Sequence, residues 1–172
     1  FAGKAHPADI PGQNVLANVL RFARDPRFSD RVIFLPDYNA HIGRLMTQGC
    51  DVWLNNPRRP REASGTSGQK AALNGNLNLS ILDGWWPEAY NGRNGWAIGD
   101  DKEWTDLVAQ DAFDVESIYR LLEQEIIPTF NTPSKWTACM KEAIQTCAPI
   151  YNTHRMVTDY LNKMYRYNTS QD

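Results

Sequence analysis

The chain has 172 residues, enough for one domain with a substantial hydrophobic core. Hydrophobic residues make up 42% of the chain and charged residues 22%, and the formal net charge is −2, which gives no general attraction to nucleic acid or to a membrane surface. No apolar run approaches the roughly 20 residues that a membrane-spanning helix needs.

The first part of the chain indicates a strand end, a helix and a second strand. Residues 1–7 resemble the end of a strand, without an initiator Met or a signal peptide, so we expect a fragment whose first strand is clipped. Residues 13–24 have the i, i+3, i+4 apolar spacing of an amphipathic helix, which Asp25-Pro26 ends. The apolar, β-branched run at 31–35 predicts a buried parallel strand.

The alternation of strands and helices continues. We expect a helix over residues 40–48, stopped by Gly49, and a strand over 50–54. This βαβ succession predicts an α/β fold with a parallel sheet, whose ligands bind beyond the carboxyl ends of the strands. That rule places Tyr38 and the loop after residue 54 on one rim of the sheet.

A loop of small residues follows, from Arg61 to Gly75. Its glycines and hydroxyl residues let the backbone approach a ligand closely. A helix is expected to begin near Thr66 or Ser67, because Ser and Thr are good N-caps, and its first free N–H groups would attract an anion. Lys70 lies about one turn into that helix. The residues alone predict either a phosphate site beside a lysine or a Gly/Ser-rich turn with a solvated lysine.

Residues 76–82 alternate polar and apolar side chains and predict another strand. Asp83 and Glu88, just after it, are candidate site acids. Trp85 and Trp86 between them either stack on a sugar ring or fill a crevice between this domain and another piece of protein. A further short strand is expected within residues 95–99.

The last third of the chain is predicted to be helical. Residues 101–112 indicate an exposed connection, so we expect a sheet core over 1–112 and a helical segment over 113–172. Three helices are expected: from the N-cap Asp114 to Pro128, from about Ser134 to Thr146, and from about Thr153 to Tyr167. We interpret their apolar stripes as core or interdomain packing rather than cofactor contacts.

The three cysteines have no metal-like spacing, and no metal site is expected. Cys139 and Cys147 lie about 12 Å apart by helical rise, too far to form a disulfide within one helix. Reduced thiols indicate a cytoplasmic protein.

One segment resembles a known family. Glu-Ala-Ser-Gly-Thr-Ser-Gly-Gln-Lys-Ala-Ala-Leu-Asn-Gly at 62–75, followed by Leu82-Asp83-Gly84, is similar to the cofactor-binding region of α-glucan (glycogen or maltodextrin) phosphorylases. Asn39 and the Trp-Trp-Pro at 85–87 depart from animal-type members and resemble a bacterial or archaeal branch. The similarity covers nearly all of this chain but only the carboxyl-terminal part of a phosphorylase. It implies a single Rossmann-like domain, with flanking helices and a helical carboxyl-terminal segment, as the second domain of a GT-B fold.

The resemblance also implies a cofactor. Lys70 would be the catalytic residue that carries pyridoxal 5′-phosphate (PLP) as a Schiff base. Backbone amides of Thr66 and Ser67 would hold the cofactor phosphate, and Tyr38 would line the cofactor pocket.

The implied reaction is phosphorolysis of α-1,4-glucan by inorganic phosphate to glucose 1-phosphate, with the cofactor phosphate as proton partner of the substrate phosphate. Glu62 would bind sugar hydroxyls, with Ser64 and Gly65 helping through their backbone. The missing amino-terminal domain of the same enzyme would be a further partner, and faces left open by its absence would allow a homo-oligomer. No nucleic acid or membrane partner is expected.

Two other functions stay open at this point. One is a nucleotide-sugar GT-B glycosyltransferase, similar to a glycogen synthase, which needs no PLP lysine. The other is a non-catalytic carbohydrate- or partner-binding module. Lys70, eight residues after Glu62, favours the phosphorylase, and we expect the isolated fragment to be inactive because half of the site is absent.

Overall fold

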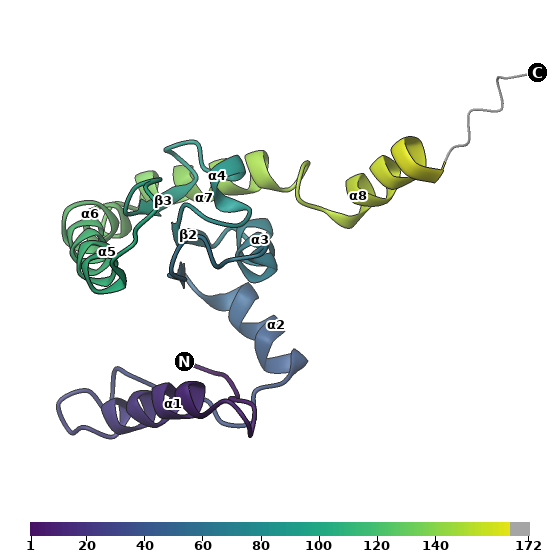
Figure 1. The fold of residues 1–172 in the computed structure, drawn as a ribbon. Helices are drawn as coiled ribbons and strands as arrows, with labels where there is room; N and C mark the ends of the chain where they lie inside the picture. Colours follow the sequence, from purple (N-terminus) through teal and green to yellow (C-terminus); the bar gives the residue numbers. More distant parts are fainter. Residues whose placement is uncertain (166–172) are drawn as a thin grey trace, which may run out of the picture. The chain divides into compact units, whose positions relative to one another are not determined.

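The protein has an α/β fold in the computed structural model, which describes residues 1–165 (Figure 1). It forms two compact units, one over Phe1–Met46 and a second that starts at Thr47. Helix α2 (Ala40–Gly49), predicted over 40–48, spans the border between them. None of the helices in the described part of the chain is both long and apolar enough to cross a membrane.

The first unit contains the predicted helix, α1 (Ile10–Ala23). It begins three residues earlier than expected, because Asp9 supplies an N-cap: its Oδ1 accepts a hydrogen bond from the Gly12 N–H at 2.9 Å.

The prediction of a buried strand over residues 31–35 is wrong. Among the described residues of this unit, the only β-bridge is the parallel one between Ala2 and Leu35, in which the Leu35 N–H donates to the Phe1 carbonyl at 2.8 Å. The amino group of Phe1 also donates to the Ile33 carbonyl at 2.7 Å. Ile33, expected in the core, is 59% exposed. An extended apolar run becomes a strand only where a neighbour pairs along its length, and this unit supplies one bridge.

The second unit is built on a three-stranded parallel sheet in the order β1-β2-β3, and the predicted strands are confirmed within a few residues. The strands are β1 (Val52–Asn55), β2 (Leu77–Ile81) and β3 (Gly95–Ile98). The central strand β2 is buried along its whole length.

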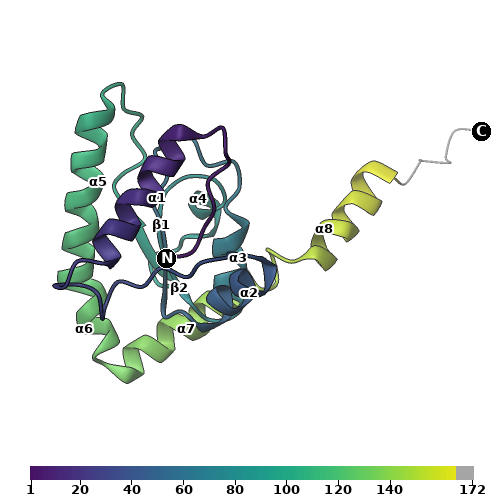
Figure 2. The same ribbon diagram turned by 90° about the horizontal axis from the view of Figure 1, so that it is seen from below.

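Helices cover this sheet (Figures 1 and 2). Helices α3 and α7 pack on β2 and on each other, and α5 packs on β3. The elements after α2 are α3 (Thr66–Leu73), α4 (Trp86–Ala89), α5 (Leu107–Leu121), η1 (Leu122–Ile126), α6 (Ile127–Phe130), α7 (Pro133–Cys147), α8 (Thr153–Tyr160) and η2 (Leu161–Tyr165).

Two expectations about α5 are wrong. Residues 107–112 are helical rather than an exposed connection, and the N-cap is Asp106 instead of Asp114, which lies inside the helix. The Asp106 carboxylate accepts hydrogen bonds from the N–H groups of Val108 and Ala109, so it satisfies two donors of the first turn. The helical path also continues past Pro128, because that proline sits in the first turn of α6, where no N–H is needed.

The last helices match their predicted ranges, with residues 166 and 167 of the third lying outside the described residues. α8 and η2 lie apart from the sheet in both ribbon views (Figures 1 and 2). Their expected core stripe is 40–65% exposed, so it does not pack in the core of the described chain. Interdomain packing of that stripe stays a prediction. The residues of this apolar stripe are Met156, Val157, Tyr160, Leu161 and Met164.

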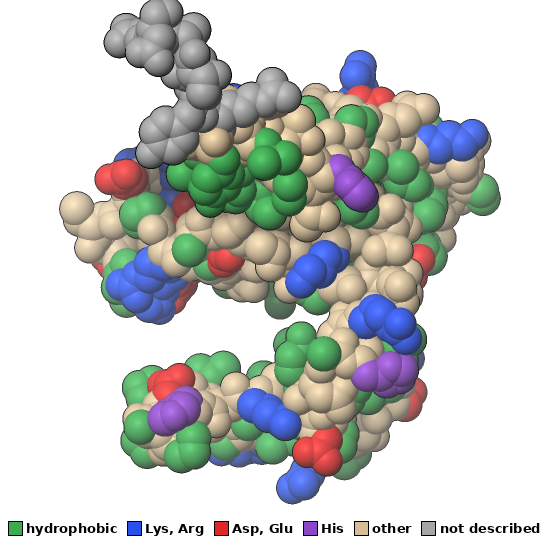
Figure 3. Space-filling model, turned by 90° about the vertical axis from the view of Figure 1, so that its right-hand side faces the viewer, with side chains coloured by type: hydrophobic (Ala, Val, Ile, Leu, Met, Phe, Trp, Pro, Cys, Tyr) green, Lys and Arg blue, Asp and Glu red, His purple; other side chains and the backbone are tan. Residues whose placement is uncertain are grey.

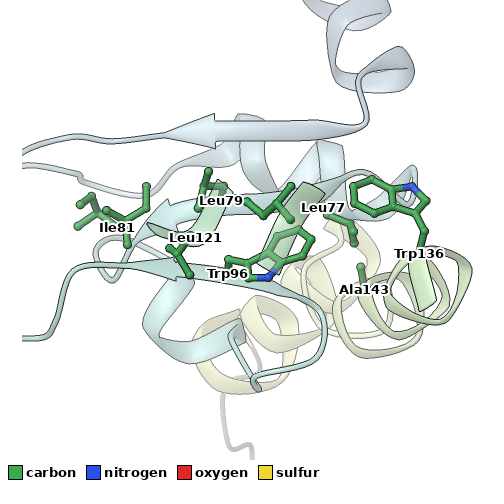
Figure 4. Packing of buried hydrophobic residues seen from close by; sticks show 9 residues of the cluster. Leu77, Leu79, Ile81, Trp96, Leu121, Trp136 and Ala143 are labelled. Atoms are coloured by element: carbon green, nitrogen blue, oxygen red, sulfur yellow. The ribbon is translucent and has the colours of Figure 1, made fainter. Parts of the chain in front are cut away.

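The core lies beneath β2 (Figure 4). Leu77, Leu79 and Ile81 pack against side chains from β3, α5 and α7, among them Trp96 and Trp136. This layer fixes the central strand and therefore the loop that follows its carboxyl end. Elsewhere hydrophobic side chains also reach the surface (Figure 3).

Candidate functional site

The candidate site lies at the carboxyl edge of the sheet. The segment that leads from β1 into α3 and the segment that follows β2 both leave this edge, because parallel strands end on the same side. The sequence placed the glycine-rich loop there, and the structure confirms that position.

Helix α3 begins with two backbone donors that have no acceptor. The helix begins at Thr66, as predicted, but its N-cap is Gly65, in the left-handed region at φ 87°, rather than a Ser or Thr. The Gly65 carbonyl accepts from the N–H groups of the third and fourth helical residues. The N–H groups of Thr66 and Ser67 therefore have no partner among residues 1–165. Free donors at the positive end of a helix attract an anion.

Lys70 adds a cation to the same helix. It lies one turn after Thr66, is exposed, and its ammonium group has no hydrogen bond or ion pair with the described residues. An amine and two amide donors thus share one short helix, which suits a ligand that has an anionic group and an electrophilic carbonyl.

The first turn of α3 rests directly on the central strand. The Asn78 Nδ2 donates to the Gly68 carbonyl at 3.1 Å, and a Cβ added at Gly68 would lie 2.6 Å from the Asn78 Oδ1. That oxygen is buried and has no hydrogen-bond partner in the described chain. Sequence analysis missed Asn78, because a polar residue in an alternating strand indicates a solvent-facing side chain, whereas β2 is buried on both faces.

The loop before α3 holds the predicted sugar-binding residues. Glu62 is half-buried, and Ser64 is exposed, with its carbonyl accepting from the Trp85 N–H at 2.9 Å. A Cβ at Gly65 would lie 3.5 Å from the Glu62 Oε1, so this carboxylate lies beside the start of the helix.

The structure thus brings six of the seven predicted site residues together on one segment, from Glu62 to Lys70. The seventh, Tyr38, lies in the first unit, where its ring packs close to Gly43. Its place in a cofactor pocket stays a prediction.

The tryptophans after β2 do not form a sugar platform. Trp85 and Trp86 are buried at 5% and 0% exposure, and their packing is internal to the second unit. Trp85 meets Tyr151 edge-on with ring centroids 4.9 Å apart, and the Trp86 Nε1 donates to the Trp96 carbonyl. Both the stacking interpretation and the interdomain-crevice interpretation are therefore wrong, because the two tryptophans fill the core of the second unit itself.

The two candidate acids differ in their surroundings. The Asp83 carboxylate accepts hydrogen bonds from backbone N–H groups of Glu62 and Gly84, whereas Glu88 is exposed. Asp83 therefore has a structural role here, because its carboxylate fixes the backbone at Glu62 and Gly84.

The cysteines offer no nucleophile. All three are free, and burial, partial for Cys50 and Cys139 and complete for Cys147, raises the pKa of their thiols. A raised pKa keeps a thiol protonated near neutral pH. Among residues 1–165, no group of three His, Cys, Asp or Glu side chains could hold a metal ion.

Comparison with known proteins gives consistent matches. The family described as carbohydrate phosphorylase matches residues 1–90, which include Tyr38 and the segment from Glu62 to Lys70. A glycogen phosphorylase of Aquifex aeolicus is 50% identical over 171 residues, which cover 96% of this chain and 24% of that protein. A maltodextrin phosphorylase of Thermococcus litoralis is 49% identical, with 96% and 20% covered. A glycogen phosphorylase of Mycobacterium tuberculosis is 45% identical, with 95% and 20% covered. The chain spans a quarter or less of the length of these relatives.

Proposed function

The chain belongs to the carbohydrate phosphorylase family, and on that premise we propose that it is the PLP-carrying, carboxyl-terminal part of an α-glucan phosphorylase. The observation that carries this proposal is the start of α3. The N–H groups of Thr66 and Ser67 lack acceptors in the described chain, and Lys70 follows one turn later without a partner there.

The free amides and Lys70 match the two functional groups of PLP that a protein must bind. The cofactor has a phosphate group, which matches two free amide donors at a helix N-terminus, and an aldehyde, which matches an exposed primary amine. When bound, its phosphate supplies the proton partner for the substrate phosphate. In this proposal Thr66 and Ser67 hold and orient that phosphate, and Lys70 fixes the other end of the cofactor covalently.

The substrate side of the proposal rests on the loop before the helix. Glu62 is half-buried next to Gly65, so its carboxylate can accept hydrogen bonds from sugar hydroxyls close to the cofactor. The substrates would be α-1,4-glucan and inorganic phosphate, and the product glucose 1-phosphate. A GT-B arrangement, in which an amino-terminal domain supplies the opposite wall, and a cytoplasmic location belong to the same proposal.

Reductive trapping tests the proposal. The full-length protein is incubated with PLP, reduced with borohydride and mapped by peptide mass spectrometry. We expect a pyridoxyl adduct on Lys70, lost in K70R and kept in K135R, a matched change of an exposed lysine on α7. Labelling spread over several lysines, or none at Lys70, would contradict the assignment.

A second measurement concerns activity. We expect the 172-residue chain alone to release no glucose 1-phosphate from maltodextrin and phosphate, because the opposite wall of the site would be absent. Phosphorolysis by the purified chain would refute this division of the site.

A further inference from the structure

The segment after β2 holds the predicted sugar-binding loop in place at the backbone level. The Asp83 Oδ2 accepts a hydrogen bond from the Glu62 N–H at 2.8 Å, across 21 residues of sequence. Its second oxygen, Oδ1, accepts from the Gly84 N–H at 2.9 Å. Two residues on, the Trp85 N–H donates to the Ser64 carbonyl at 2.9 Å. The two segments are therefore joined on both sides of Ala63.

Between these hydrogen bonds the segments touch without space for a side chain. Gly84 has φ 58°, and a Cβ added there would lie 2.6 Å from the Ser64 carbonyl oxygen and 2.9 Å from the Glu62 Cγ. Real Cβ atoms do not approach backbone oxygens this closely, so only glycine fits. The stem of the Glu62 side chain thus lies against the backbone of Gly84.

The segment after β2 is itself anchored in the core. Trp85 is buried, packs against Tyr151, and lies under the start of α3, where a Cβ at Gly65 would be 3.0 Å from its Cδ1. A continuous set of contacts therefore leads from the hydrophobic cluster through Trp85 and Asp83 to the backbone of Glu62.

We infer that Asp83 is a positioning residue for substrate: its carboxylate fixes the Glu62 backbone and so aims the Glu62 carboxylate at the glucan. The inference rests on the proposed function, in which Glu62 binds sugar hydroxyls. A carboxylate that accepts hydrogen bonds from two backbone N–H groups makes short, charge-assisted bonds, and these restrict the movement of both donors. Binding groups must be held within about 0.5 Å of their productive geometry, which such a contact can supply.

Kinetics of the full-length enzyme test this role. Asparagine at position 83 keeps the shape but offers one acceptor oxygen and an NH2 group that faces a donor. We expect D83N to raise the KM for maltodextrin between about ten- and a hundredfold, because small misplacements of a binding group cost this much. The KM for inorganic phosphate should change less than about twofold, and the pyridoxyl adduct on Lys70 should form as in the parent.

The matched control is D106N. Asp106 also accepts from two backbone N–H groups, but at the start of α5, away from the predicted loop. Because both bonds to Asp106 go to one oxygen, which asparagine keeps, D106N should be about as stable as the parent, and only D83N should change the KM for maltodextrin. Equal KM values for D83N, D106N and the parent would overturn the inference, as would a parallel rise in the KM for phosphate.

Amide hydrogen exchange tests the contact without a variant and without activity. In the 172-residue chain the Glu62 N–H should exchange at least about tenfold more slowly than that of Ala63, which has no acceptor among the described residues. Equal exchange at the two amides would refute the hydrogen bond to Asp83. Absence of a Lys70 adduct in the parent would instead refute the proposed function, and the exchange result would still decide the contact.

Discussion

Replacing Gly68 by alanine should destabilise the second unit, although alanine is the better helix former. The added Cβ would lie 2.6 Å from the Asn78 Oδ1 and 3.1 Å from the Trp85 Nε1. Neither neighbour can move freely, since Asn78 is 1% exposed and Trp85 is 5% exposed. The Asn78 amide also donates to the Gly68 carbonyl, so a shift of α3 breaks that hydrogen bond.

The magnitude of the G68A effect follows from three contributions. Overpacking costs about 1–3 kcal/mol, and loss of a buried hydrogen bond costs about 1–2 kcal/mol. Alanine in place of glycine inside a helix stabilises the helix by about 1 kcal/mol, which offsets part of this loss. The net loss should be about 1–4 kcal/mol, and its midpoint of about 2.5 kcal/mol lowers the melting temperature of a protein of this size by roughly 5–10 °C.

Tryptophan fluorescence is a suitable probe for G68A, because all six tryptophans lie at or after position 53, in the second unit. Urea and thermal unfolding of the variant are compared with those of the parent and of G49A. A Cβ at Gly49 meets nothing within 4 Å, so G49A should stay within about 0.5 kcal/mol of the parent. If G68A unfolds at the same midpoint as G49A, α3 does not rest on β2 as described.

Three further changes test local features of the second unit by the same unfolding measurements. D106A should cost about 1 kcal/mol through loss of the α5 cap, and an unchanged midpoint would contradict the cap. G65A should cost about 1–2 kcal/mol, because alanine is strained at φ 87°; no loss would mean that the turn has another conformation. Partial burial, then repulsion from Asp111 and Asp100, raises the pKa of Asp114 above its ordinary 3.8. The folded state therefore holds this proton more tightly than the unfolded state, and stability falls as pH rises from 3.8 through the raised pKa. D114N should be more stable than the parent above that window, by less than about 1 kcal/mol, and equal to it below pH 3.8; a gain that persists at low pH would refute this cause.

The elements that sequence predicted well are those that local pattern determines. The polar-apolar alternation before Leu82 and the i, i+3, i+4 spacing along α7 need no distant partner to be recognised, and β2 and α7 lie where they were expected. The run at 31–35 has an equally strong apolar pattern but forms no strand, because strand formation depends on a paired neighbour. The start of α5 was missed for another reason: polar residues near Asp106 indicated a loop, while the same aspartate is a good N-cap.

Within the candidate site, too, the features set by local sequence could be predicted and those set by distant contacts could not. A loop rich in Gly, Ser and Thr that runs into a helix was sufficient to predict where α3 begins and that Lys70 lies one turn into it, while the anion site at its start stays a prediction. The role of Asp83 could not be predicted, because its acceptor geometry depends on a contact between two segments that each follow a different strand. Burial of Trp85 and Trp86 depends equally on distant partners, here residues of α7 and of the segment that follows it.

Gly65 connects the stability of α3 with its proposed function. A Ser, Thr, Asp or Asn side chain at this N-cap would itself accept from the second or third N–H of the helix, and so compete with a bound phosphate. Glycine has no side-chain acceptor and leaves the second N–H, that of Ser67, open, and compared with the better caps it costs the helix only a few tenths of a kcal/mol. It also supplies φ 87° and leaves room for Trp85, whose Cδ1 would be 3.0 Å from a Cβ. One residue thus turns the chain from the loop fixed by Asp83 into a helix whose first amides have no partner in the described protein, which is the arrangement that an incoming phosphate requires.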